Sequence, residues 1–110
     1  MANKYFRKAL IPAATTETVI LEVPAANTAI VRSLRVTNTG SSPTDISVTQ
    51  YVDGVMTGNS LQKERPLGAK TTQDVFNGVP CVLEAGDELK ITASSADVHF
   101  YLSYIEVDRT

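Results

Sequence analysis

Two segments of this 110-residue chain alternate apolar and polar residues, and this alternation most limits what the chain can fold into. The first segment is Ala29–Gly40 (AIVRSLRVTNTG) and the second is Val82–Ala93 (VLEAGDELKITA). A period of two, bounded by residues that favour turns, is typical of a half-buried antiparallel strand. The two segments therefore predict an all-β protein.

Turn-forming residues divide the rest of the chain into further short segments of the same kind. Their spacing predicts about eight short strands in a single antiparallel β-sandwich, jelly-roll-like in its order. The N-terminal arm or first strand is expected at residues 1–17, and the sandwich domain at residues 18–110. The expected strands, of which Val55–Leu61 is irregular, are Tyr5–Leu10, Thr18–Val23, Thr28–Asn38, Asp45–Tyr51, Val55–Leu61, Thr71–Phe76, Val79–Leu83, Asp87–Ala93 and Val98–Val107.

Within Thr28–Asn38 the alternation places Ile30, Leu34 and Val36 on one face and Val31 on the other. Arg32 falls on the apolar face and interrupts the pattern. A long cationic side chain keeps its charged end in water while its methylene stem covers apolar surface. We therefore expect Arg32 near the strand end or with its guanidinium reaching out to solvent, and a buried ion pair is the alternative.

Two polar stretches are expected to lie outside the strands. Asp53-Gly54 is a strong signal for a tight hairpin, because the turn it favours needs residues with positive φ. Gln62–Pro66 (QKERP) is charged and ends in proline, which predicts a loop.

The last strand carries aliphatic or aromatic side chains on both faces, so we expect it to be central in its sheet or covered on its second side. One face holds Val98, Phe100, Leu102 and Tyr104, and the other holds His99, Tyr101, Ser103 and Ile105. Tyr101 and Ile105 either form an apolar patch that joins copies of the chain or are covered by a loop or by the N-terminal strand.

The N-terminal segment is locally basic, although the formal net charge of the whole chain is −2. Lys4, Arg7 and Lys8 precede the first acidic residue, and Tyr5 and Phe6 lie among them. Positive charges protect an exposed edge strand from unwanted pairing. The functional alternative is an arm whose aromatic and cationic side chains contact a partner.

Composition and cysteine content exclude several classes of protein. Cys81 is the single cysteine, so no intrachain disulfide is expected, and its apolar neighbours predict a buried small hydrophobe. No apolar run is long enough for a membrane span, and the N-terminus has no signal-peptide core, which predicts synthesis in a cytoplasm. The pI of about 5.3 argues against nucleic-acid binding.

The sequence offers little for catalysis, so no enzymatic activity, cofactor or metal is expected. Its one histidine, His99, is expected at the surface or in an interface, because a lone histidine lacks the partners of a catalytic site. The acidic residues lie at turns or strand edges, which does not suit the paired carboxylates of a glycosidase. A calcium loop at Glu84–Glu88 is the alternative to a simple tight turn.

The strand signatures also carry a family resemblance. The run Val23–Asn38 (VPAANTAIVRSLRVTN), followed by Leu83–Ala93 (LEAGDELKITA) and a final strand, resembles small virion proteins of tailed bacteriophages. The resemblance covers about residues 18–107 and rests on turns and strands. It implies a β-sandwich component of a particle, either a capsid cement or decoration protein or a small neck, tail or baseplate subunit. The sequence departs from the pattern at the charged loop Lys63–Arg65 and at the first segment, Tyr5–Leu10. These departures are either partner contacts or the result of divergence.

The resulting hypothesis is a non-enzymatic bacteriophage virion structural protein, made and assembled in the bacterial host cytoplasm. Its expected partners are further copies of itself, as a homo-oligomer, and the major capsid protein or other virion proteins, with no nucleic acid or membrane. A carbohydrate- or surface-binding β-sandwich module is the alternative. The candidate partner contacts are Lys4, Tyr5, Phe6, Arg7, Lys8, Tyr101 and Ile105.

Overall fold

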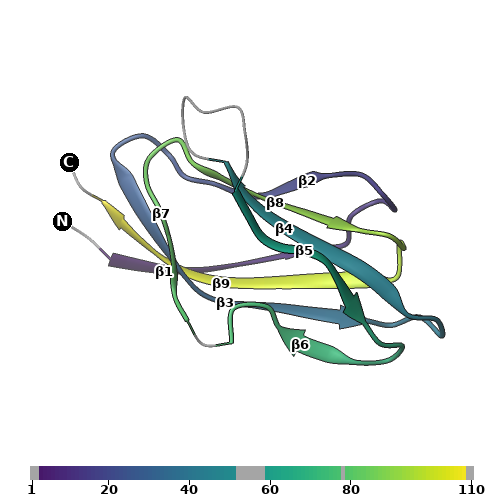
Figure 1. Cartoon of the computed structure of the whole chain (residues 1–110). Coiled ribbons are helices and arrows are strands. Elements are labelled where there is room, and N and C mark those ends of the chain that lie inside the picture. Colours follow the sequence, from purple (N-terminus) through teal and green to yellow (C-terminus); the bar gives the residue numbers. More distant parts are fainter. Residues whose placement is uncertain (1–2, 52–58, 78, 109–110) are drawn as a thin grey trace.

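The protein is an antiparallel β-sandwich (Figure 1), seen in a computed structural model that describes residues 3–51, 59–77 and 79–108. Side chains are described for residues 4–51, 64–77 and 79–107. The described part of the chain contains no helix, and therefore no helix that could span a membrane. The described residues form nine strands, which are β1 (Asn3–Leu10), β2 (Thr18–Glu22), β3 (Asn27–Asn38), β4 (Thr44–Tyr51), β5 (Asn59–Leu67), β6 (Thr72–Asp74), β7 (Cys81–Leu83), β8 (Glu88–Ala93) and β9 (Val98–Asp108).

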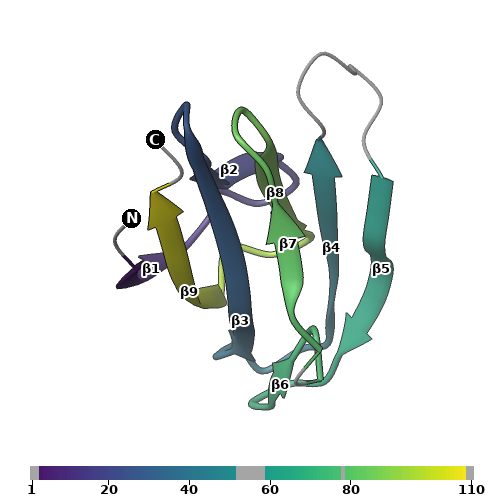
Figure 2. The same cartoon turned by 90° about the vertical axis from the view of Figure 1, so that its left-hand side faces the viewer.

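The strands form two sheets whose order is that of a jelly roll. The larger sheet runs β1-β9-β3-β6, with β7 also paired to β3, and the smaller sheet runs β2-β8-β4-β5. β6 and β7 both pair with β3, so the strand position beside β3 is filled in two pieces (Figure 2). The jelly-roll-like sandwich expected from the sequence is therefore confirmed, and the final strand is central, between β1 and β3.

The core fills the space between the two sheets. The inner faces of β3 and β9 contribute side chains that are almost completely inaccessible to solvent, and β4 and β8 supply the facing layer. Each fully buried aliphatic or aromatic side chain stabilises the fold by about 1.5–3 kcal/mol. The largest of these side chains are Phe100, Leu21, Leu34, Ile46, Leu67, Leu83, Leu89, Ile91, Leu102, Val23, Val31 and Val36.

A β-bulge at Arg32 corrects the face assignment made for β3. The register between β3 and β9 shifts between Val31 and Ser33, so one extra residue lies between them. An extra residue reverses the alternation. Val31 is therefore buried with Leu34, whereas Ile30 is half-buried on the opposite face. Arg32 lies in the middle of the strand, not near its end, and its side chain is exposed.

The prediction of a loop at Gln62–Pro66 is wrong, because these residues belong to β5. β5 pairs with β4 alone, and its register shifts on both sides of Val48. A strand with one free edge and bulged pairing tolerates charged residues and proline, since not every amide must join a ladder. The predicted hairpin turn at Asp53-Gly54 lies outside the described residues.

Candidate interaction surface

The N-terminal strand β1 lies beside β9 and pairs with it over the whole of Asn3–Leu10 (Figure 1). Residues opposite each other in such a pair share a face of the sheet. Phe6 lies opposite the buried Tyr104, and so faces inward, whereas Tyr5 lies opposite Ile105 and faces outward. β1 therefore extends the larger sheet at its edge and does not cover its outer face.

Four apolar side chains line up across the outer face of the larger sheet. Tyr5 on β1 lies opposite Ile105 on β9, which lies opposite Ile30 on β3, which in turn lies opposite Val82 on β7. Tyr5 is 80% exposed and Val82 is 51% exposed, while Ile30 and Ile105 between them are half-buried. We call these four residues the apolar row. It joins strands from both ends and the middle of the chain.

Three exposed arginines flank the apolar row on the same face. Arg7 lies opposite Ser103, and the Arg35 guanidinium lies 5.6 Å from the centroid of the Tyr101 ring. An arginine over an aromatic face is attracted by the ring and held in place by it. Between β1, β9 and the bulge is a depression of about 610 Å³, lined by Tyr5, Phe6, Arg7, Arg32, Tyr101, Ser103 and Tyr104.

The sequence candidates divide between the two sides of the sheet. Tyr5, Arg7, Tyr101 and Ile105 meet on the outer face, as the pairing of β1 with β9 shows. Lys4, Phe6 and Lys8 alternate with them and point to the inner side of the edge strand, although all three are exposed at the sheet margin. Their roles as partner contacts stay predictions.

Sequence reasoning missed four residues of this surface: Ile30, Arg32, Arg35 and Val82. Alternation along each strand puts Arg35 and Val82 on the outer face, and the pairing of β3 with β9 and β7 brings them beside Tyr101 and Ile30. The interrupted alternation at Arg32 was the one local signal of a bulge. No signal in the sequence indicates which strands become neighbours.

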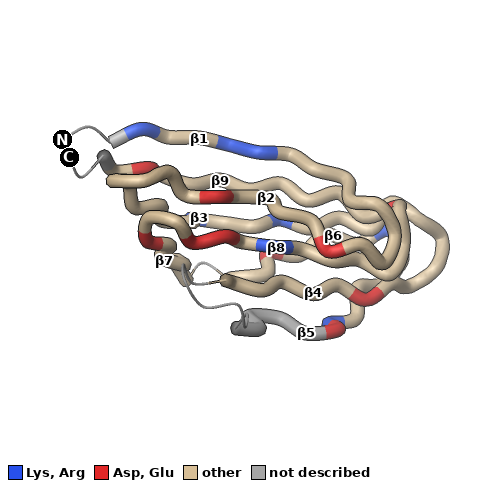
Figure 3. Tube along the Cα trace, turned by 90° about the horizontal axis from the view of Figure 1, so that it is seen from above, with Lys and Arg blue, Asp and Glu red and all other residues tan. Residues whose placement is uncertain are grey.

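The outer face of the smaller sheet has the opposite charge. Five acidic side chains lie on or beside it, and Lys90 is the cation among them in the described part of that face; these acids are Glu17, Glu22, Asp45, Glu64 and Glu88. The Nζ atom of Lys90 lies 3.8 Å from Oε1 of Glu88 and 4.3 Å from the centroid of the Tyr51 ring. Figure 3 shows basic stretches on β1 and acidic stretches along the smaller sheet.

Tyr51 belongs to this acidic face. Its hydroxyl donates a hydrogen bond to Glu17 at 3.1 Å. The bond raises the pKa of Tyr51 above 10.0, and loss of hydration and the charges of Glu17 and Glu88 add to the effect. This hydrogen bond links the end of β4 to the residue that precedes β2.

The remaining polar candidates have structural surroundings. Asp87 is buried, and its carboxylate accepts a hydrogen bond of 2.9 Å from the backbone amide of Glu84. Gly86 has a φ of 84°, so this segment is a tight turn. Cys81 is half-buried against the core, and this burial raises the pKa of its thiol. The side chain of His99 is exposed. Among the described residues, no group of three His, Cys, Asp or Glu side chains is arranged to hold a metal ion.

No protein-family model matches this sequence, and neither does any curated protein. The fold is nevertheless shared with solved structures of very different sequence. A protein of Bacillus endospore appendages, which form disulfide-linked pili, is 13% identical and superposes with a TM-score of 0.59, covering 99% of this chain and 88% of that one.

A chain from the T13 viral particle of infectious bursal disease virus is 8% identical, with a TM-score of 0.61 over 94% of this chain. The match covers 30% of that chain, so the present sequence corresponds to one part of it. A pentameric capsid protein from metagenomic phage sequences is 22% identical over 93% of this chain and 59% of its own, but its TM-score of 0.38 is too low to define a shared fold. At these identities the likeness establishes the β-sandwich fold alone.

Proposed function

We propose that this chain is a non-enzymatic structural subunit of a bacteriophage virion, where it self-associates and binds other proteins of the particle. A capsid cement or decoration role is favoured over a neck or tail role. The observation that carries the proposal is the open outer face of the larger sheet, with its apolar row and flanking arginines. Contiguous exposed apolar groups with nearby arginine and aromatic side chains are typical of protein interfaces.

The fold supports this assignment. Two solved structures with the same sandwich come from assemblies of many copies, a pilus and a viral particle. A subunit of this kind needs a rigid core, surface complementarity and no tuned catalytic groups. Among the described residues, the buried layer between the sheets provides the rigid core. The two oppositely charged faces provide surfaces that can be complementary.

Electron microscopy of purified particles tests the virion assignment directly. Particles of the virus that carries this gene should be labelled by a gold-conjugated antibody raised against the chain. We expect regularly placed label on heads if the chain is a cement protein, and label at one vertex or along the tail if it is a neck or tail subunit. Particles without label, alongside free chain in the lysate, would refute the virion role.

The depression beside β1 favours one alternative, a carbohydrate-binding module. Tyr5, Phe6 and Tyr101 border it, and Tyr5 is 80% exposed. Exposed aromatic rings are suited to packing against sugar rings. Binding to a glycan array that is abolished by Tyr5→Ala would support this alternative, and a blank array would leave the virion proposal in place.

A further inference from the structure

The two outer faces of the sandwich are complementary to each other in charge. The larger sheet presents Arg7, Arg32 and Arg35, with two acids on the same side, Asp74 in register with Arg35 and Glu84 beside Thr28. Among the residues whose side chains the structure describes, the smaller sheet presents five acids and Lys90. Although the whole chain carries a formal charge of only −2, the charge is therefore distributed as one basic face and one acidic face.

We infer that copies of this chain associate head to tail, with the outer face of the larger sheet of one copy docked on the outer face of the smaller sheet of the next. This inference rests on the proposed function and specifies its self-association. The occupant of the basic face is thus the acidic face of a second copy. Opposite charges steer such faces together and discriminate against contact between like faces.

Like-with-like contact is unfavourable on both sides of the molecule. A two-fold contact between two larger sheets places arginines against arginines around the apolar row. A two-fold contact between two smaller sheets brings one acidic face against another. Juxtaposed like charges cost several kcal/mol in an interface.

Exposed apolar groups are available on both faces. The apolar row crosses the larger sheet, and on the smaller sheet Val19 is 41% exposed and lies opposite Lys90 in the strand pairing. The molecule measures 47 × 27 × 21 Å along its principal axes. A face spanned by the longest axis and either shorter one exceeds the area of about 800 Å² that each partner contributes to a standard interface.

The position of the faces determines the form of the assembly. They lie on opposite sides of the sandwich, so a copy that docks through one face leaves its other face free. A contact between two different surfaces generates a closed ring or an open filament, in contrast to a two-fold dimer. Several copies, not two, are the expected product.

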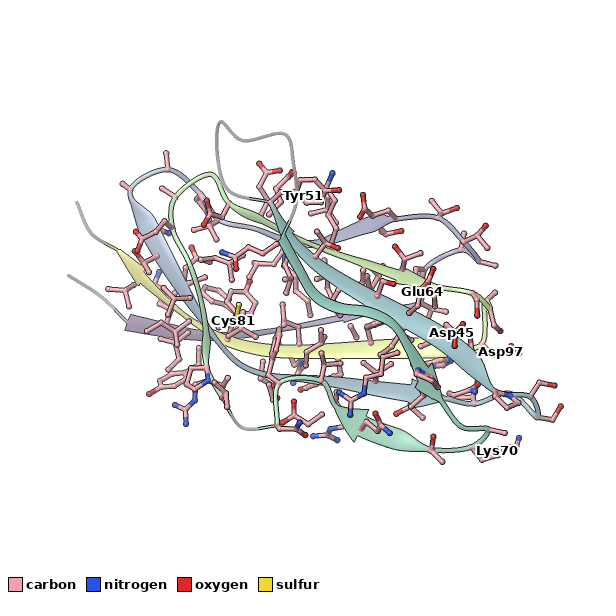
Figure 4. The ribbon with its side chains drawn as sticks, in the orientation of Figure 1. Asp45, Tyr51, Glu64, Lys70, Cys81 and Asp97 are labelled. Carbon is pink, nitrogen blue, oxygen red and sulfur yellow. The ribbon has the colours of Figure 1, made fainter. Side chains whose placement is uncertain are left out.

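Charge reversal on one face at a time tests the inference, with absolute mass measured by light scattering on a sizing column. One variant carries Arg7→Glu and Arg32→Glu, and another carries Glu22→Lys and Asp45→Lys. All four side chains are exposed, so folding should persist, and circular dichroism melting curves verify it. The control is Lys70→Glu with Asp97→Lys, which reverses two exposed charges at one end of the sandwich and leaves the net charge unchanged (Figure 4).

We expect the wild-type chain to exceed its monomer mass of 11.9 kDa by several-fold at low salt, and the mass to fall as salt is raised. Either face variant alone should dissociate about 100-fold more readily, whereas the control should match the wild type. Mixing the two face variants should restore the high mass, because every contact between them is again complementary.

Three results would overturn the inference. A high mass that survives reversal of the acidic face but not of the basic face would mean a two-fold contact, and the virion proposal would stand. A control that dissociates as far as the face variants would mean non-specific charge effects. A wild-type monomer at every concentration and salt would refute head-to-tail contact, while antibody labelling of particles would still decide the virion role.

Discussion

The ring of Phe6 stacks on the ring of Tyr104, with 5.4 Å between the centroids and 24° between the ring planes. Tyr104 belongs to the buried core, so this contact ties the edge strand β1 to the interior of the sandwich. Tyr5, one residue earlier, projects from the opposite face of the same strand. Neighbouring aromatic residues in β1 therefore have separate roles, one in stability and one in the exposed surface.

Replacement of each aromatic residue should separate these roles. Phe6→Ala removes the stacking and part of the buried area, and should lower the free energy of unfolding by about 1–2 kcal/mol. Tyr5→Ala removes an exposed side chain and should change it by less than about 0.5 kcal/mol, while weakening self-association. Urea unfolding and light scattering measure the two effects. Equal destabilisation by both substitutions would contradict the assignment of faces.

The bulge at Arg32 should depend on the number of residues in β3, not on the arginine side chain. Deletion of Arg32 removes the extra residue, so Val31 and Ser33 follow each other opposite Tyr104 and Ser103, and the side chains on both sides of the bulge keep their faces. We expect the deletion variant to fold without the bulge, with a loss of less than about 2 kcal/mol in the free energy of unfolding. Arg32→Ala should keep the stability within about 0.5 kcal/mol and should weaken self-association. A deletion variant that fails to fold would contradict the prediction, because it would show that the sandwich needs the bulge itself.

Asn38 should be a main stabiliser of the loops at one end of the sandwich. Its buried amide donates to the carbonyl oxygens of Ser42 at 2.9 Å and of Leu67 and Gly68 at 3.3 Å, and its Oδ1 accepts the Gly40 amide at 2.9 Å. Asn38→Ala leaves these groups unsatisfied and should cost about 2–3 kcal/mol in denaturant unfolding.

The control for Asn38→Ala is Ser41→Ala, in the same turn. Ser41 is exposed, so its substitution should change the free energy of unfolding by less than about 0.5 kcal/mol. Similar values for the two variants would show that the buried amide adds nothing beyond the turn itself.

Tyr104 should make the protein sensitive to alkali. Burial raises its pKa above 10.0, and the negative charge of Glu106 adds to the shift. The fold therefore prefers the protonated phenol, and this contribution is full below pH 10 and is lost as the pH rises through the folded-state pKa. Stability measured by urea unfolding between pH 9 and pH 12 should fall less steeply in Tyr104→Phe than in the wild type. Parallel curves would contradict the prediction.

Local alternation predicted the inner face of β9 correctly, because Val98, Phe100, Leu102 and Tyr104 all face the core. It failed at two places for physical reasons. One extra residue at Arg32 reversed the faces within β3, and a period of two has no means of indicating where a bulge absorbs a residue. The charged stretch Gln62–Pro66 is a strand, since its pairing with β4 outweighs its weak intrinsic preference.

The amino-acid sequence by itself determined the class of fold and most of the core, because both follow from the alternation of side chains within single strands. The candidate surface was decided by tertiary structure. Tyr5, Ile105, Ile30 and Val82 form one row only because β1, β9, β3 and β7 pair side by side in a particular register. Those contacts join residues up to 100 positions apart along the chain. Their register depends on how all the strands pack around one core, and no local pattern carries that information.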